Sequence, residues 1–300
     1  MKDIFCAFNG EKGAFADVAV RSYFGDGVAS VPCASFDDVF ALVDAGQAAF
    51  GMVPIENSTT GSIYQNYDNF SRYEGIEIVG AVAIRIRHSL LAPFGTALED
   101  IRTVYSHPQG FYQCSSFLKD SGWNLVETVS TATGAKLVGT KNDRSCAAIA
   151  DASNAGLYNL EVLKDSIEDN PENYTRFVVI ASRDGTYGSC RKITEKGIPN
   201  KVSFTFTAKN EVGSLYACLG VCKDAELNLT KIESRPIPGC PWSYRFFADA
   251  TLPVKERAAS DESASSLTGT VLALERAVAA FKAEFALVAE DIRVLGMYRE

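Results

Sequence analysis

Histidine is scarce in this sequence, because only His88 and His107 occur among its 300 residues. A catalytic zinc site with several histidine ligands is therefore excluded. A Ser-His-Asp triad would have only these two imidazoles available as its base. The chemistry of any active site must come mainly from other side chains.

Basic clusters are missing as well. The chain has 29 Lys and Arg against 37 Asp and Glu, a net charge of -8, and its basic residues form no long run. Binding of DNA or RNA requires a concentrated face of Lys and Arg. We therefore expect no nucleic acid as partner. A small anionic substrate remains compatible with this composition, because a binding pocket is local.

Metal-binding cysteine motifs and long apolar runs are also absent. The eight cysteines never form a C-x-x-C pair, so a zinc knuckle or a thioredoxin-like motif is not expected. They are spread through apolar stretches, which predicts reduced, buried thiols. No stretch approaches ~18 apolar residues, so we expect no membrane partner. The first 13 residues are too polar for a signal peptide, and we expect a cytoplasmic location.

The first 180 residues alternate between short apolar segments and amphipathic helical segments. Alternation of this kind predicts an α/β layered fold with largely parallel sheets. Proline at position 108 favours a helix that begins there. The expected strands are 4–8, 28–33, 49–55, 76–86, 103–106, 125–129, 146–150 and 177–181, and the expected helices begin near residues 14, 35, 62 and 108.

The pattern changes at residues 183–200, which contain four Gly or Pro residues and little periodicity. We expect a linker there. The last 100 residues then follow the order β-α-β-β-α-β, which is ferredoxin-like and predicts a separate, small α+β domain. Its expected strands are 202–207, 227–234, 242–250 and 292–295, with helices at 215–222 and 271–285.

Polar residues follow several of the expected strands. Open α/β sheets bind ligands beyond the carboxyl ends of their parallel strands. The strings are VPIENSTTGS from Val53, SHPQGFYQC from Ser106, and NYTRF from Asn173, followed in the small domain by GSLY from Gly213 and NLTKIESRP from Asn228. Taken singly, each is equally compatible with a helix cap or an ordinary strand end.

Taken together and in this order, these strings resemble the prephenate dehydratases that carry a C-terminal ACT regulatory domain. The resemblance implies an α/β catalytic domain at residues 1–182, with two lobes like a periplasmic binding protein and the active site between them. Lobe one would comprise about residues 1–77 plus 176–182, and lobe two about 78–175. Residues 183–200 would be the linker, and residues 201–300 an α+β, ferredoxin-like (βαββαβ) ACT domain.

The resemblance also implies roles for individual residues. Thr175 matches the threonine that the family requires for catalysis. Asn57, Ser106 and Gln113 match its substrate-binding amides and hydroxyl, and Arg176 is the expected partner of a substrate carboxylate. Ala14 departs from the family, which often has a hydroxyl residue there. The expected L-phenylalanine effector residues are Gly213, Ser214, Leu215, Tyr216, Asn228, Leu229, Glu233 and Ser234.

The implied reaction is the decarboxylative dehydration of prephenate to phenylpyruvate, a lyase reaction of phenylalanine biosynthesis. It requires no metal and no cofactor. L-phenylalanine would be the allosteric effector, and a homodimer or homotetramer would assemble through the ACT domains. No chorismate mutase helix bundle precedes residue 1, which favours the monofunctional form. Arogenate dehydratase and a non-catalytic amino-acid sensor are the alternatives, and arogenate differs from prephenate by an amino group in place of the keto oxygen.

Overall fold

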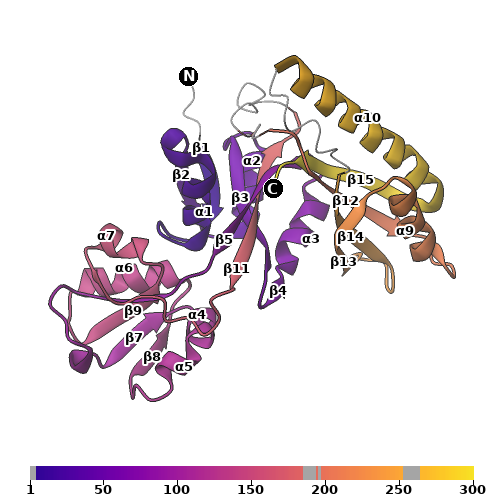
Figure 1. The fold of residues 1–300 in the computed structure, drawn as a ribbon. Coiled ribbons are helices and arrows are strands. Elements are labelled where there is room, and N and C mark those ends of the chain that lie inside the picture. The colour runs from indigo at the N-terminus through magenta and orange to yellow at the C-terminus, as the bar shows by residue number, and fades with distance from the viewer. Residues whose placement is uncertain (1–4, 185–193, 195–196, 253–263) are drawn as a thin grey trace. The chain divides into compact units, whose positions relative to one another are not determined.

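The computed structural model describes residues 5–184, 194, 197–252 and 264–300 (Figure 1). Most of the predicted linker and Cys190 therefore lie outside the described residues. The contacts between residues divide the chain into two compact units. The first comprises Met1–Leu42, Gly51–Ile63 and Val82–Phe177, and the second Val43–Phe50, Tyr64–Ala81 and Val178–Glu300.

The first sheet has the strand order β2-β1-β3-β11-β5, and the short β4 pairs with β3. The pair β1 and β2 is parallel, with Phe5 opposite Ala29. Strand β3 is buried along almost its whole length, as its continuous apolar run predicts. The strands are β1 (Phe5–Asn9), β2 (Ala29–Cys33), β3 (Phe50–Asn57), β4 (Gly61–Ser62), β5 (Ile76–Arg85) and β11 (Tyr174–Ser182); the helices are α1 (Phe15–Phe24), η1 (Gly25–Gly27), α2 (Phe36–Asp44) and α3 (Tyr64–Arg72).

The second sheet has the order β10-β6-β9-β7-β8. Strand β7 is parallel to β8 and β9, but β6 is antiparallel to β9 and β10. The sheet is therefore mixed, which corrects the expectation of largely parallel sheets. Its strands are β6 (Ser89–Ala92), β7 (Thr103–Ser106), β8 (Asn124–Glu127), β9 (Cys146–Ala150) and β10 (Glu161–Lys164); its helices are η2 (Leu98–Asp100), α4 (Pro108–Gln113), α5 (Ser115–Leu118), α6 (Thr131–Lys141) and α7 (Ser153–Tyr158).

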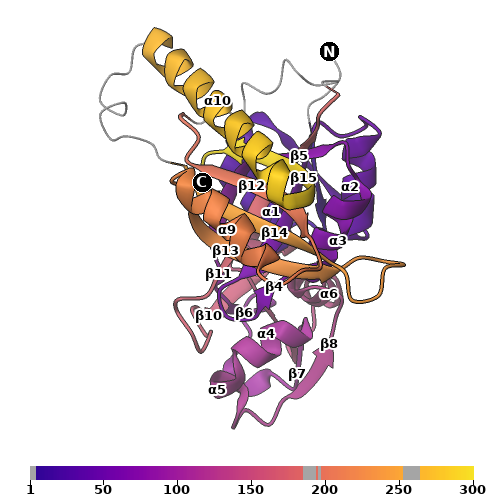
Figure 2. The ribbon, with the colours of Figure 1, turned by 90° about the vertical axis from the view of Figure 1, so that its right-hand side faces the viewer.

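The third sheet has the order β13-β14-β12-β15, and its recorded pairs are antiparallel. Both helices pack on one face of it, as Figure 2 shows, over a core that contains Phe204, Phe206, Phe281 and Phe285. These four rings contact one another at centroid distances from 4.8 to 6.1 Å. The elements are β12 (Lys201–Ala208), α9 (Ser214–Asp224), β13 (Asn228–Pro236), β14 (Tyr244–Thr251), α10 (Ala264–Val288) and β15 (Ala289–Tyr298), in the predicted order.

Three local predictions need correction. Strand β11 begins at Tyr174, three residues before the predicted start, so that Thr175 lies within the strand. Trp242 is not part of β14, because its φ of 67° turns the chain, and its side chain is exposed. Among the seven described cysteines, Cys33 is only partly buried and Cys240 is exposed, whereas the others are buried as predicted.

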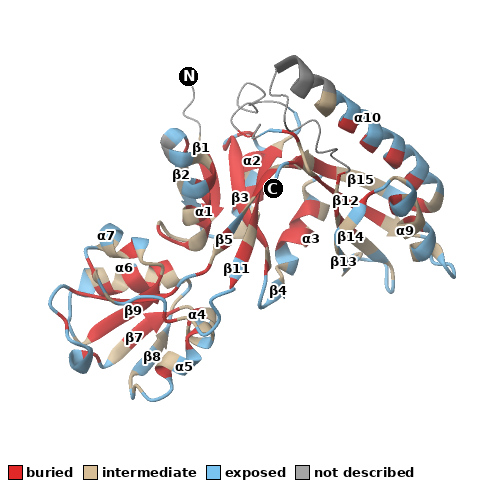
Figure 3. Ribbon diagram, viewed as in Figure 1, coloured by how far each residue is buried: buried red, intermediate tan, exposed pale blue. Residues whose placement is uncertain are grey.

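Strands inside the sheets, such as β3, β9 and β12, are more buried than edge strands such as β2, β8 and β13 (Figure 3). Strand β9, for example, has all of its residues buried. Within the described part of the chain, no helix has the length and apolar character needed to cross a membrane.

Candidate active site

The centre of the site is the side-chain amide of Asn57, at the end of β3. Its Nδ2 donates to Oγ1 of Thr175 at 3.0 Å and to Oδ1 of Asn173 at 2.7 Å. Its Oδ1 accepts from the backbone N–H groups of Thr59 and Thr60, at 3.0 and 2.9 Å. Both ends of the amide are therefore engaged within the protein, and Asn57 orients its neighbours.

The hydroxyl of Thr175 is poised as a donor. It accepts a hydrogen bond from Asn57, so its own hydrogen must point elsewhere. The described residues offer no recorded acceptor for that hydrogen. Thr175 is 8% exposed, so a small part of it is accessible. A bound molecule with an oxygen atom there would receive this hydrogen bond.

Gln113 ends helix α4 and borders a small hollow of about 220 Å³, which also touches Thr59 and Asn173. Both residues belong to the Asn57 hydrogen-bond network. Gln113 is thus linked to the Asn57–Thr175 pair through the residues that line this hollow, although the three residues were predicted from separate motifs. The complete lining is Thr59, Tyr112, Gln113, Ser115, Glu168, Asp169, Asn170 and Asn173.

Ser106 lies at the end of β7 with no exposed surface. Its hydroxyl donates to the backbone oxygen of Ile149 at 2.8 Å. A Cβ atom at Gly110 would lie 2.5 Å from this hydroxyl, so glycine allows α4 to approach it closely. The structure therefore places Ser106 beneath α4, where it supports the helix, and its direct contact with substrate stays a prediction.

The side chains of Arg176 and Thr175 point away from each other, although the two residues are adjacent in β11. Successive residues of a strand point to opposite faces of the sheet, so Arg176 is on the face opposite Thr175. There its guanidinium pairs with the carboxylate of Glu56, 3.2 Å away, and Glu56 in turn precedes Asn57 in β3. The structure does not bring Arg176 together with the predicted catalytic hydroxyl, and its role as carboxylate partner stays a prediction.

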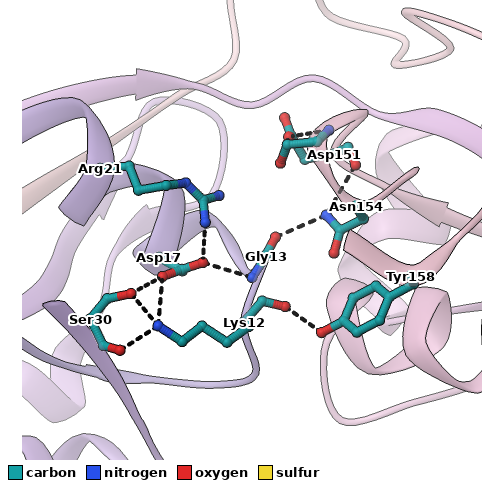
Figure 4. Close-up of polar contacts among 9 residues, drawn as sticks. Lys12, Gly13, Asp17, Arg21, Ser30, Asp151, Asn154 and Tyr158 are labelled. Carbon is teal, nitrogen blue, oxygen red and sulfur yellow. Dashed lines mark hydrogen bonds and ion pairs between the residues drawn. The ribbon is translucent and has the colours of Figure 1, made fainter. Parts of the chain in front are cut away.

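The loop before α1 is organised by Asp17, a carboxylate with no exposed surface that the motif analysis did not single out (Figure 4). Asp17 accepts from the backbone N–H of Gly13 at 2.8 Å, from the hydroxyl of Ser30 at 2.5 Å and from Arg21 at 2.5 Å. Its position in the first turn of α1 was the only sequence signal. A buried carboxylate with several donors fixes a loop strongly, because each donor also stabilises its charge.

The other side of the same loop contacts α7. Asn154 donates from Nδ2 to the backbone oxygen of Gly13 at 2.9 Å, and the Tyr158 hydroxyl donates to the backbone oxygen of Lys12 at 2.5 Å (Figure 4). Lys12 and Gly13 thus connect the β1–α1 region with the second sheet's helices. Ala14, which lacks the family's usual hydroxyl, precedes α1 and makes no side-chain cap.

The predicted effector residues lie in two places of the second unit. Gly213 precedes helix α9 with a φ of 85°, and Tyr216 in its first turn is 82% exposed. Asn228, Leu229, Glu233 and Ser234 lie on β13, an edge strand of the third sheet that contacts α9.

These features define a two-sheet α/β protein with a polar site at strand ends, followed by an α+β region. The family model for prephenate dehydratase matches residues 6–185. A bifunctional chorismate mutase/prephenate dehydratase of Pseudomonas aeruginosa is 37% identical over 81% of this chain. An arogenate dehydratase/prephenate dehydratase 2, chloroplastic, of Arabidopsis thaliana is 34% identical over 81% of it. The chain spans 64% of the length of each of these relatives.

Two solved structures are similar to this chain over nearly its whole length. A prephenate dehydratase from Arthrobacter aurescens in complex with L-Phe is 25% identical, with a TM-score of 0.78 over 99% of this chain and 90% of that one. GqqA, described as a novel type of quorum quenching acylase, is 27% identical, with the same TM-score over 98% and 97%. The chain belongs to the prephenate dehydratase family, whose domain model matches residues 6–185.

Proposed function

We propose that this chain converts prephenate to phenylpyruvate, carbon dioxide and water in the biosynthesis of L-phenylalanine. The observation that supports this most directly is the contact between Asn57 and Thr175, which leaves the threonine hydrogen available to a ligand. Departure of the ring carboxylate as CO2 delivers an electron pair to the ring, and the C4 hydroxyl leaves as water once it gains a proton from the solvent. The product ring is aromatic, so the reaction needs no redox step.

Thr175 would stabilise the leaving oxygen by a hydrogen bond as negative charge develops on it. A preorganised donor of this kind typically contributes ~10²–10³ in kcat. Full proton transfer from threonine is disfavoured, because general acids work best with a pKa near the operating pH. Gln113 would bind the substrate through its amide, for which the described residues give no recorded partner at Nε2.

Residues 201–300 would form an ACT domain that binds L-phenylalanine, because their βαββαβ order and the predicted effector residues match such a domain. The similar prephenate dehydratase from Arthrobacter aurescens, whose structure contains L-Phe, supports this assignment. Exposed apolar side chains at Val212, Tyr216 and Ile232 lie at or near β13 and α9, and a second copy of the chain would cover them. We therefore propose a homodimer or homotetramer. Cytoplasmic location stays a prediction.

A physical connection for feedback lies within the second unit. Arg235, which follows Ser234 in β13, binds both carboxylate oxygens of Asp68 in α3, at 2.9 and 2.8 Å. It also stacks over the ring of Tyr64, the first residue of α3. Helix α3 follows directly after the segment that begins at Asn57, so a shift of β13 would reach the site along the chain.

The test is phenylpyruvate formation from prephenate by the purified protein, with and without millimolar L-phenylalanine. Arogenate in a parallel reaction tests the first alternative. An N-acyl amide in a third reaction tests the acylase activity that the name of one similar structure describes. Turnover of prephenate that L-phenylalanine suppresses supports the proposal. Binding of L-phenylalanine without turnover of any substrate would instead support an amino-acid sensor.

A further inference from the structure

His88 is a buried side chain outside every predicted motif, and it contacts Gln113. The residue is 1% exposed. Its ring Nε2 lies 2.8 Å from Oε1 of Gln113. Its backbone N–H donates to Glu168 at 3.0 Å, its backbone oxygen accepts from Ile167 at 2.9 Å, and Phe15 packs edge-on against the ring. The imidazole is therefore fixed in orientation.

The hydrogen of this imidazole can be assigned from its surroundings. Burial lowers the pKa of His88, so the ring is neutral at pH 7 and has one N–H. Nδ1 is buried and has no hydrogen-bond partner among the described residues. With the hydrogen on Nδ1, the protein would contain a buried N–H without an acceptor, which is rare in folded proteins. The hydrogen therefore belongs on Nε2, which donates it to Gln113.

The ring is neutral although the charges around it favour its protonated form. Glu168 and Asp151 are the carboxylates that act on it, and both favour the protonated form. Glu168 is already engaged with Arg85, 3.4 Å away, and with the backbone of His88. Desolvation outweighs these carboxylates, so the pKa of His88 still lies below its ordinary value.

We infer that His88 is a positioning residue that engages the carbonyl oxygen of Gln113 and thereby directs the two amide N–H donors of Gln113 toward an anionic substrate. A glutamine amide rotated by 180° would present its oxygen instead and would repel a carboxylate. This inference rests on the proposed function, because it assumes that Gln113 contacts prephenate, a dianion. The inference explains why the Gln113 amide presents N–H donors, and not its oxygen, to the substrate.

The kinetic test compares four variants of the full chain with prephenate as substrate: His88→Leu, His88→Gln, Gln113→Leu and the double variant with leucine at both positions. His88→Leu removes the donor, and we expect KM to rise about tenfold or more, the effect of one hydrogen bond to a charged group, with kcat changed by less than about threefold. His88→Gln keeps an N–H donor near the position of Nε2, and we expect KM within about threefold of the native value. In a Gln113→Leu background, His88→Leu should have no further effect, because it acts only through Gln113.

An unchanged KM in His88→Leu would overturn the inference. The inference would also be overturned if His88→Leu raised KM by the same factor in the native and Gln113→Leu backgrounds. A merely structural role of His88 would have the same effect on KM in both backgrounds. Native protein that fails to convert prephenate refutes the proposed function itself, which is a separate outcome.

A second measurement needs no turnover and no destabilising substitution. The chain has only two histidines, so ¹⁵N-histidine labelling gives a simple spectrum, and His88→Gln assigns it. We expect His88 to be protonated at Nε2 and unprotonated at Nδ1 at neutral pH. His107 is an internal reference, because its Nδ1 accepts from the backbone of Gln109 at 3.1 Å. Protonation of His88 at Nδ1 would contradict the inference.

Discussion

Nδ2 of Asn57 and Oγ1 of Thr175 lie 3.0 Å apart, although 118 positions separate the two residues in the sequence. This hydrogen bond sets the direction of the threonine hydroxyl before any ligand arrives. Preorganisation of this kind is effective in catalysis because the donor needs no reorientation during the reaction.

Asn57→Asp should lower kcat strongly. Aspartate has nearly the same shape but offers only acceptors, so the Thr175 hydroxyl would donate to residue 57 and no longer to the substrate. We expect kcat for prephenate to fall by ~10²–10³, the typical effect of losing one preorganised donor. Ser58→Ala is the control, since it removes a neighbouring hydroxyl that bonds only the backbone of residues 172 and 174. A native kcat in Asn57→Asp would refute the positioning role.

Gly13→Ala should destabilise the first unit more than Gly61→Ala. Both glycines have nearly the same positive φ, 85° and 84°, so the backbone strain of alanine, about 1–2 kcal/mol, is matched. At Gly13 the new Cβ would also lie 2.2 Å from Oδ1 of Asn154, whereas at Gly61 no atom lies within 4 Å. Urea denaturation measures the difference. Equal losses in the free energy of unfolding would show that the contact with Asn154 is unimportant.

The stability of the protein should decrease at mildly acidic pH partly through His88. Its pKa in the folded protein lies below the ordinary 6.5 because of burial, so the unfolded chain binds more protons as the pH falls below about 6.5. This contribution to the free energy of unfolding is complete above that pH, decreases below it, and levels off below the folded-state pKa. His88→Gln should lack this component. The prediction would be contradicted if the native protein and His88→Gln lost the same free energy of unfolding between pH 7.5 and 5.5.

Asp68→Asn should weaken inhibition by L-phenylalanine and leave the uninhibited kcat unchanged. It removes the charged partner of Arg235 and thus weakens the contact between β13 and α3. Because allosteric coupling is typically ~1–3 kcal/mol, we expect the half-inhibitory concentration to rise roughly fivefold or more. Asp291→Asn is the matched control, since its ion pair with Arg245 lies within the third sheet. Equal sensitivity of native protein and Asp68→Asn would exclude this route.

The sequence predicted elements well where a single local signal was strong. Strands 103–106 and 146–150 have their predicted bounds, because each is a short segment that polar residues follow directly. Strands β6 and β10 were not predicted. Ser89–Ala92 is only four residues long and Glu161–Lys164 is half exposed, so neither has a strong local signal. Antiparallel pairing between distant segments defines both strands.

The site was predictable as a set of residues but not as a geometry. The motifs named Asn57, Gln113 and Thr175, and the structure adds the contacts that orient them. The predicted strand begins at residue 177, whereas β11 begins at Tyr174. Arg176 therefore lies within the strand, on the face of the sheet opposite Thr175. His88 had no signal in the sequence, because its role comes from a contact across 25 positions.

The most direct test of the catalytic role of Thr175 is the kcat of Thr175→Val and Thr175→Ser with prephenate. Valine keeps the shape and removes the hydroxyl, whereas serine keeps the hydroxyl. We expect valine to lower kcat by ~10²–10³ and serine to retain most of the activity. A native kcat in Thr175→Val would contradict the role of this hydroxyl in the reaction.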